Sequence, residues 1–248
     1  MTSFAITLIA IGIADLTHGA GPVRGARLLV GPVVVLVLGV LTDAHGAAIP
    51  LLIVGALTCV LWQVLSAPGD SGTPHPAFAF TALALGLAVL LLCWNAGPPV
   101  GGVLAHWADR AAIPGLDRVG VDGAALIIGL FLVQLSTGNV IVRLILRAIG
   151  AIRPPGQPQP SDTLRGGRLL GPMERVFILG LALAGQVTAA GIVIAAKGLL
   201  RFPELTVRRD RTETQGVGID AVTEYFLVGS FVSWLVALSC VAAAHLLL

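Results

Sequence analysis

Charged residues are scarce in this sequence: Asp, Glu, Lys and Arg together make up 11% of the 248 residues, against 56% hydrophobic residues. A soluble domain carries about 25% charged residues, so this composition excludes an ordinary soluble fold. The formal net charge of +2 is too small to indicate a nucleic-acid partner, and the basic residues fall in short loops rather than along one face. The chain therefore belongs in a lipid bilayer.

Cysteine and lysine are also rare. Cys59, Cys93 and Cys240 sit inside apolar runs with no CxxC or Cys/His spacing, which argues against disulfides and against a zinc site. We therefore expect no metal and no cofactor. One lysine against fourteen arginines, with abundant Gly, Ala and Val, is typical of a GC-rich bacterial genome. The expected location is the bacterial plasma membrane.

Long apolar runs are what the sequence has in abundance. A bilayer core about 30 Å thick needs about 20 helical residues, and runs of this length recur along the chain. They are too long for the strands of a closed barrel, so helices are required. The sequence predicts an all-α integral membrane protein with six or seven transmembrane helices, in the runs 3–19, 25–43, 47–66, 77–95, 123–146, 172–201 and 224–247.

A Pro-rich segment at residues 151–168 predicts a linker between two membrane lobes. The N-terminal lobe, residues 1–150, contains five of the predicted helices, and the C-terminal lobe covers residues 169–248. Within the first lobe, residues 100–113 predict either a helix lying on the membrane surface or an ordered loop.

Two pairs of acidic and histidine residues, Asp15 with His18 and Asp43 with His45, suggest metal ligands at first sight. They belong at opposite ends of the second apolar run, about 25 Å apart at 1.5 Å per residue. We therefore expect polar residues at helix ends near the membrane surface, and no metal site.

The run at residues 172–201 predicts either one tilted span or a re-entrant hairpin of two half-helices, each about 14 residues long. Gly185 relaxes the backbone, and Gln186 and Thr188 can bond to the freed peptide groups if the tip is buried in protein. With the first five runs spanning, a hairpin leaves thirteen basic residues cytoplasmic and two external, whereas a single span gives eight against seven. Because basic residues favour the cytoplasmic side, the count favours the hairpin.

Ionisable residues would gather at the mouth of such a hairpin, because its two ends lie side by side. Ionisable groups at membrane depth tend to pair or to line a polar cavity. The sequence thus suggests an anion or headgroup site, with snorkelling helix ends and a structural ion pair as the alternative. The candidate ligand- or anion-binding residues are Glu174, Arg175, Lys197, Arg201, Glu224 and Tyr225.

Polar side chains also interrupt the apolar runs. Gln134 and Asn139 lie in the fifth run, and Gln186 and Thr188 lie at the break of the sixth. Such residues hydrogen-bond across a helical bundle or line a polar pathway, and the sequence leaves both roles open.

Five motifs follow one another in the second half of the chain: LSTGNVIVRLILRAIG, GGRLLGPMER, a GQ break, AAKGLLRF and EYFLVGSFVSWLVAL. Together they resemble the C-terminal half of an uncharacterised bacterial multi-pass membrane protein family, a domain of unknown function, over residues 130–248. The first 120 residues lack the early histidine and aspartate arrangement of that family. The resemblance implies a membrane location and makes the six charged-mouth residues candidates for a shared site.

The sequence leaves two functions open. A broken helix with charged ends favours a transporter-like protein for a small solute or ion. The alternative is a non-catalytic membrane subunit, or a lipid- or anion-binding scaffold of a larger complex. Expected partners are membrane lipids with anionic headgroups, further copies of the chain, or other subunits. No nucleophile–base pair, HExxH motif or phosphate loop is visible, so an enzyme is not indicated.

Overall fold

The computed structural model describes residues 2–17, 24–67, 76–111, 113–152, 159, 167–207 and 219–248. Within these ranges, only the backbone is described at residues 24–26, 167–168, 197–198, 200–207 and 219–221. The described part of the chain is all-helical and contains no strand, as the sequence predicts. It forms two compact units: unit 1 is Met1–Thr137 with Leu246–Leu248, and unit 2 is Gly138–His245. The predicted linker at 151–168 lies mostly outside the described residues.

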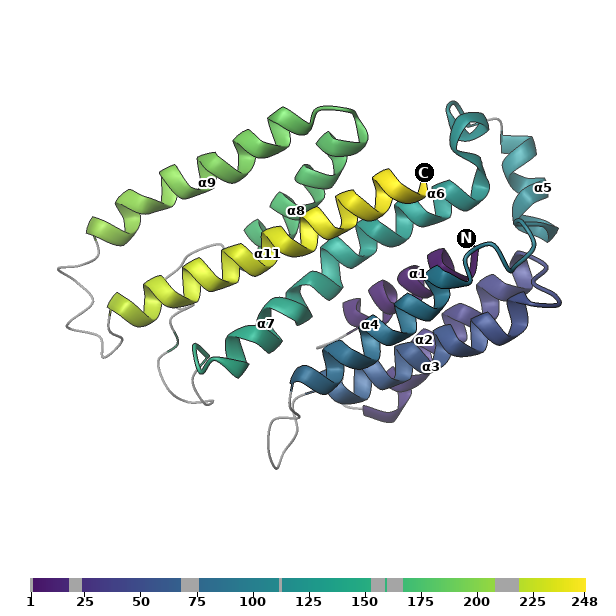
Figure 1. Cartoon of the computed structure of the whole chain (residues 1–248), viewed down its shortest axis with the longest axis horizontal. Helices are drawn as coiled ribbons and strands as arrows, with labels where there is room; N and C mark the ends of the chain where they lie inside the picture. The colour runs from purple at the N-terminus through teal and green to yellow at the C-terminus, as the bar shows by residue number, and fades with distance from the viewer. Residues whose placement is uncertain are drawn as a thin grey trace. The chain divides into compact units, whose positions relative to one another are not determined.

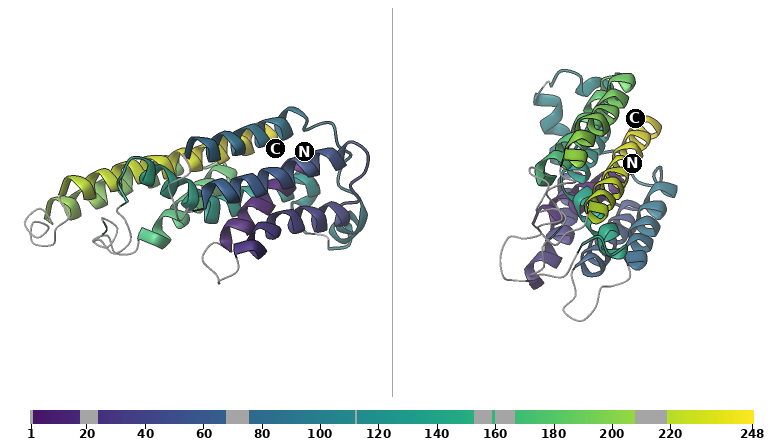
Figure 2. Two further views of the ribbon diagram at one scale, coloured as in Figure 1. Left: turned by 90° about the horizontal axis from the view of Figure 1, so that it is seen from below. Right: turned by 90° about the vertical axis from the view of Figure 1, so that its left-hand side faces the viewer.

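Unit 1 is organised around its first helix. The helices are α1 (Thr2–Leu16), α2 (Arg24–Leu41), α3 (Ala48–Ser66), α4 (Pro76–Leu92), α5 (Gly102–Ala111), α6 (Leu116–Leu132) and the short π-helix η1 (Val133–Thr137). The first four, purple to blue in Figures 1 and 2, form an antiparallel bundle. Eleven of the fifteen residues of α1 are buried, because α2, α3, α6 and η1 all pack against it.

Small residues allow the helices of unit 1 to approach closely. A side chain at Gly55 of α3 would collide with Thr7, and one at Gly86 of α4 would collide with Thr58. Both threonine hydroxyls donate back to carbonyls of their own helix, Thr7 to Ser3 and Thr58 to Val54, each at 2.8 Å. The bundle therefore packs through Gly–Thr contacts, as apolar helices do where lipid surrounds them.

Unit 2 contains α7 (Gly138–Ala148), α8 (Gly167–Leu183), α9 (Val187–Val207) and α11 (Ile219–Leu247). Ile178 of α8, Ala190 of α9 and Ala237 of α11 form a buried core, so these three helices pack around one apolar centre. Figure 1 shows α8 and α9 (green) side by side, joined by a short turn. The helical break predicted near Gly185 is therefore present.

The turn between α8 and α9 differs from the prediction in one respect. Gly185 has φ of +75°, and the backbone N–H groups of Gly185 and Gln186 donate to the carbonyls of Ala182 and Leu181 at 3.0 and 2.8 Å. This is a Schellman cap, in which the left-handed glycine lets the backbone satisfy itself. The side chains of Gln186 and Thr188 are exposed, so the condition of a tip buried in protein is not met within unit 2.

The two helices of this hairpin are also longer than the half-helices expected. Helix α8 has 17 residues and α9 has 21. At 1.5 Å per residue they measure about 25 and 31 Å, close to the thickness of a bilayer core. Each helix of the pair is thus about as long as a complete crossing requires.

The segment at residues 100–113, which predicted either a helix or a loop, contains the helix α5. Its Val103 and Trp107 side chains are 67% and 57% exposed, so apolar groups lie on its outer face. Contact of this face with a membrane surface stays a prediction.

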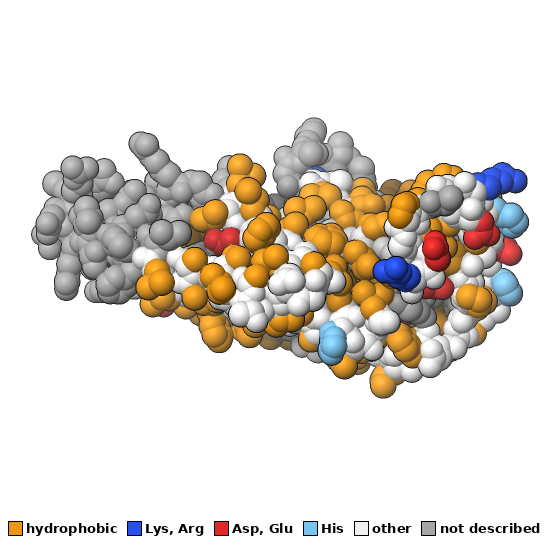
Figure 3. All heavy atoms as spheres, turned by 90° about the horizontal axis from the view of Figure 1, so that it is seen from above, with side chains coloured by type: hydrophobic (Ala, Val, Ile, Leu, Met, Phe, Trp, Pro, Cys, Tyr) orange, Lys and Arg blue, Asp and Glu red, His pale blue; other side chains and the backbone are white. Residues whose placement is uncertain are grey.

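Three helical segments are long and apolar enough to cross a membrane: Ala48–Ser66, Leu116–Ala148 and Val222–Leu247. Shorter apolar helices accompany them, among them α1 and α4. Figure 3 shows a face covered largely by hydrophobic side chains, with most of the charged groups drawn on it toward the right-hand end. These features are compatible with a membrane protein, and the number of six or seven spans stays a prediction.

Candidate functional site

Arg175 is the charged side chain around which the candidate site in unit 2 is built. It lies three residues before Ile178 on α8, so both side chains belong to the same face of the helix. That face is buried against α11, and only 1% of Arg175 is exposed. The guanidinium of Arg175 is therefore buried inside unit 2, because it lies on the helix face that packs in the apolar core.

Two hydrogen bonds hold the guanidinium between three helices. Nη1 donates to Oγ of Ser233 on α11 at 2.9 Å, and Nη2 donates to Oδ1 of Asn139 on α7 at 2.8 Å. Both acceptors are neutral, so they satisfy N–H groups of Arg175 without cancelling its charge. The two bonds fix the plane of the guanidinium.

Gly138 provides the space for the guanidinium. A Cβ at this position would lie 2.6 Å from Nε and 2.9 Å from Cζ of Arg175. Any side chain here would therefore compete with the arginine for the same volume. Gly138 and Asn139 open α7, so one turn of this helix supplies both the gap and a hydrogen-bond acceptor.

The other members of the predicted charged mouth differ in how deeply they are buried. Glu174, beside Arg175 on α8, and Tyr225 on α11 are half-buried, and Glu224 is exposed. Glu224 precedes Ser233 by nine residues on α11, about 13 Å along the helix axis. The side chains of Lys197 and Arg201 lie outside the described residues. The hydrogen bonds described for Arg175 thus go to Ser233 and Asn139, neither of which is among the six candidate residues.

The four polar residues predicted for helix packing or a pathway fall into two groups. Gln134 in η1 is fully buried, and Asn139 is the acceptor for Arg175. Gln186 and Thr188 lie on the exposed turn instead. The polar residues of the fifth run are therefore interior groups, and those of the break are surface groups.

Ser233 is a site residue that the sequence reasoning missed. It belongs to a stripe of buried small residues on α11 spaced alternately by three and four positions: Ser230, Ser233, Ala237, Cys240 and Ala244. This spacing marks the inward face of a helix. Together with the hydroxyl on that face, this spacing is the signal that could have identified Ser233 as a partner of a buried charge.

Unit 1 contains a second polar centre at Asp15. This residue was expected at a helix end near the membrane surface, but only 5% of it is exposed. Its two carboxylate oxygens accept hydrogen bonds from Nε1 of Trp62 at 3.2 and 3.0 Å. Asp43 is exposed, and no group of three or more His, Cys, Asp or Glu in the described chain could hold a metal ion.

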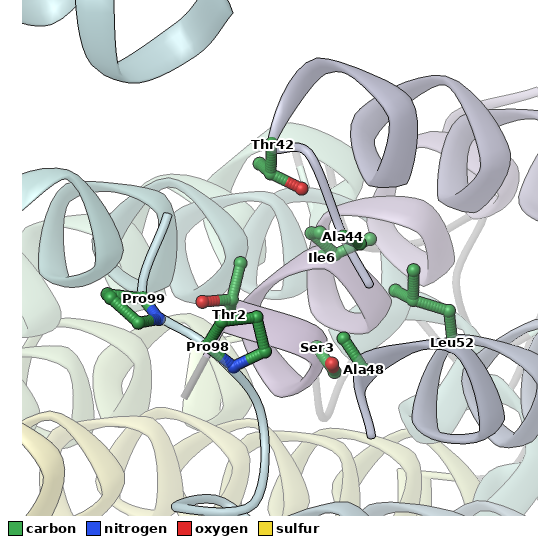
Figure 4. A pocket seen from close by; sticks show the side chains of 9 residues that line it. All are labelled: Thr2, Ser3, Ile6, Thr42, Ala44, Ala48, Leu52, Pro98 and Pro99. Carbon is green, nitrogen blue, oxygen red and sulfur yellow. The ribbon is translucent and has the colours of Figure 1, made fainter. Parts of the chain in front are cut away.

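A surface pocket in unit 1 offers little room for a ligand. It lies between the first residues of α1, the end of α2, the start of α3 and the prolines Pro98 and Pro99 (Figure 4). Its space of about 220 Å³ includes open solvent, whereas ligand pockets measure about 300 to 1,000 Å³. We assign it no function.

Comparisons with family models, with curated proteins and with solved structures found no match for this chain. The fold and the buried charges define the class of the protein. It is a helical protein compatible with a membrane, with a buried arginine, Arg175, in unit 2 and a buried aspartate, Asp15, in unit 1. Similarity to an uncharacterised membrane family stays an expectation based on the motifs.

Proposed function

We propose that this chain is a multi-pass protein of the bacterial plasma membrane that binds small anions at Arg175, in the manner of a transporter. The membrane assignment is supported by the three long apolar helices and by leucines such as Leu92 and Leu246, which are 86% and 77% exposed. In water such exposure would be unfavourable, whereas lipid solvates these side chains.

The α8–α9 hairpin crosses the bilayer completely in this proposal, which gives the chain eight spans in place of the six or seven predicted from the sequence. A re-entrant tip would hold Gly185, Gln186 and Thr188 in the hydrocarbon, where exposed polar groups are strongly disfavoured. These residues are exposed in unit 2, and α8 and α9 have 17 and 21 residues, of which Val187–Ala196 is the apolar part of α9. A complete crossing moves the turn to the external surface and leaves both hairpin ends cytoplasmic, so the count of thirteen basic residues against two is unchanged.

Single cysteines test this topology in a background without Cys59, Cys93 and Cys240. We expect Gln186→Cys to react with a membrane-impermeant thiol reagent from outside intact cells, because the turn reaches the external surface. Thr206→Cys, at the other end of α9, should react only after the cytoplasmic side is opened.

Ala96→Cys, in the external connection between α4 and α5, is the positive control for outside labelling. Protection of Gln186→Cys from both sides would support the re-entrant hairpin and contradict the complete crossing. External labelling of Thr206→Cys would mean that residues 172–201 form a single span.

The observation that carries the anion-binding proposal is the buried guanidinium of Arg175, oriented by Asn139 and Ser233. A charged side chain among membrane helices is energetically unfavourable, and such residues commonly line a substrate or ion pathway. Guanidinium groups suit carboxylate and phosphate ligands, because their N–H groups match two oxygens at once. The expected solute class is a small oxyanion or carboxylate.

Asn139→Asp tests the anion site with a change of almost no volume. It places a carboxylate where the amide oxygen now accepts a hydrogen bond from Nη2 of Arg175. We expect the purified parent protein to melt several degrees higher in phosphate, sulfate or acetate than in a buffer of equal ionic strength without them. The variant should fold but lose most of this effect, because its own carboxylate neutralises the guanidinium.

Arg143→Gln is the matched control, since Arg143 is an exposed arginine on the same helix α7. It should leave the anion effect unchanged. Equal stabilisation of the parent and Asn139→Asp would contradict anion binding at Arg175, and loss of the effect in Arg143→Gln would place the anions at the surface.

The second function, a membrane subunit or anionic-lipid scaffold, is favoured by the basic end of α7. Arg143 is exposed and Arg147 half-buried there, in the region where cytoplasmic arginines attract anionic headgroups. Purification in a mild detergent distinguishes the two functions. A stoichiometric second subunit, or bound anionic lipid whose amount falls in Arg143→Gln but not in Asn139→Asp, would favour the scaffold.

A further inference from the structure

The polar centre of unit 1 lies where three helices end or begin. Thr7 lies beside Gly55 and Asp15 beside Trp62, so α1 and α3 run in the same direction. Asp15 is the last residue but one of α1, and Ser66 is the last residue of α3. The start of α2 lies at the same end, because α2 is antiparallel to both. A buried carboxylate is thus held close to one end of the bundle.

The carboxylate is positioned by a neutral donor. Nε1 of Trp62, a side chain that is 0% exposed, donates to both oxygens of Asp15. An indole N–H can only donate, and it carries no charge, so it orients the carboxylate and leaves its charge in place. Because the indole contacts the carboxylate directly, its surroundings change when the carboxylate is protonated.

Two further polar side chains follow on α3. Gln63 and Ser66 are each 4% exposed, and Nε2 of Gln63 and Oγ of Ser66 have no hydrogen-bond partner in the part of the chain that is described. Buried polar atoms nearly always have a partner, from protein or from water. Ser66 is one helical turn beyond Trp62, so a buried hydroxyl lies one turn from the indole at the end of α3.

Few titratable groups lie on the described helices around Asp15, and of the three on α6, Asp117, Arg118 and Asp122, the last accepts a hydrogen bond from Thr2 at the other end of α1. The described α1 and α4 carry no other titratable side chain, and η1 carries none. On α3 the neighbour is Cys59, which meets α2 where a Cβ at Gly31 would lie 2.7 Å from Cβ of Cys59. On α2 it is Arg27, half-buried and one turn before Gly31. Among the described residues of α2 and α3, the groups to test beside Asp15 are therefore Arg27 and Cys59.

We propose that Asp15 is a reversible proton-binding site of unit 1. A proton passes from a hydronium ion to one carboxylate oxygen, so that an O–H bond of the hydronium ion breaks as the O–H bond of the carboxyl group forms; deprotonation is the reverse transfer to water. Trp62 keeps the carboxyl group in place in both states. This site is independent of anion binding at Arg175, since it uses other helices and other chemistry.

Fluorescence of Trp62 tests the proposal. A variant with Trp94, Trp107 and Trp234 replaced by phenylalanine leaves Trp62 as the one indole in the sequence. We expect its emission to change in one step between about pH 4 and pH 9, the range in which carboxyl groups in proteins titrate. The step should be absent in Asp15→Asn and present in Asp43→Asn, an exposed matched control.

Three further measurements separate the proton site from other causes. Cys59→Ala should keep the step, which excludes the thiol, and Arg27→Gln should displace its midpoint, because a positive charge on the neighbouring helix α2 has been removed. Infrared difference spectra of the unmodified protein should show a protonated carboxyl band at the same pH, independently of whether Asp15→Asn folds.

The proposal is overturned if Trp62 emission is constant over this range while the protein stays folded, or if the step survives in Asp15→Asn. An infrared band absent at the midpoint would equally contradict it. Loss of the step in Cys59→Ala would assign the titration to the thiol instead.

Discussion

Replacing Gly12 with alanine is expected to lower the stability of unit 1 by about 2 kcal/mol or more, although alanine is the better helix former. A Cβ at Gly12 would lie 2.6 Å from Cβ and 3.0 Å from the carbonyl carbon of Leu132. Backbone atoms cannot rotate away, so α1 must separate from the opposing helix. The separation would also stretch the 2.7 Å hydrogen bond from Oγ of Ser136 to the carbonyl oxygen of Gly12.

The buried thiol of Cys59 provides the measurement. In a variant that retains only this cysteine, a thiol-reactive dye reports the melting of unit 1, because Cys59 is 1% exposed before unfolding. Gly39→Ala is the matched control on α2, where the added Cβ would meet only Cδ1 of Leu52, at 2.8 Å. That methyl group ends a flexible side chain and can move. Equal melting temperatures for Gly12→Ala and Gly39→Ala would contradict the close contact of α1 with Leu132.

Replacing Gly138 with leucine should be at least as damaging in unit 2. Four added carbon atoms would enter the volume filled by the guanidinium of Arg175, which a Cβ alone would approach to 2.6 Å. The guanidinium would lose its hydrogen bonds to Asn139 and Ser233 while remaining in a buried setting. Bonds that involve a charged group contribute about 1.5 to 3 kcal/mol each, so we expect a loss of about 3 kcal/mol or more.

A variant that retains only Cys240 reports the melting of unit 2 by the same dye assay, because Cys240 is buried. Gly180→Leu on α8 is the control, since a Cβ there would meet no heavy atom within 4 Å. A Gly138→Leu protein that melts like Gly180→Leu would mean that Arg175 does not occupy this space.

The helices themselves were predictable from the sequence, because apolar runs of bilayer length have no other stable form in lipid. The break at Gly185 was predictable for a related reason, since glycine is the residue that accepts the left-handed conformation of a helix cap. The side-chain roles of Gln186 and Thr188 were not, because the backbone can satisfy itself in a Schellman cap and no polar side chain is then needed.

The partners of the buried charges could not be derived from sequence patterns. Arg175 bonds to residues 36 and 58 positions away, and Asp15 to one 47 positions away. Helical periodicity identifies which face of each helix turns inward, but it does not specify which inward faces meet. For this reason the sequence predicts neither the contacts of Arg175 with Asn139 and Ser233 nor that of Asp15 with Trp62.

The bond between Arg175 and Ser233 also bears on the order in which the chain is assembled. Ser233 lies on the last helix, 58 residues after the arginine, so α8 and α9 leave the ribosome before this acceptor exists. Until α11 inserts, Asn139 is the described acceptor available to the guanidinium, and the face of α8 that later contacts α11 is open. Helix α11 thus closes unit 2 around a charge that was synthesised earlier, and a chain that stops before Ser233 would leave the guanidinium without one of its two described acceptors.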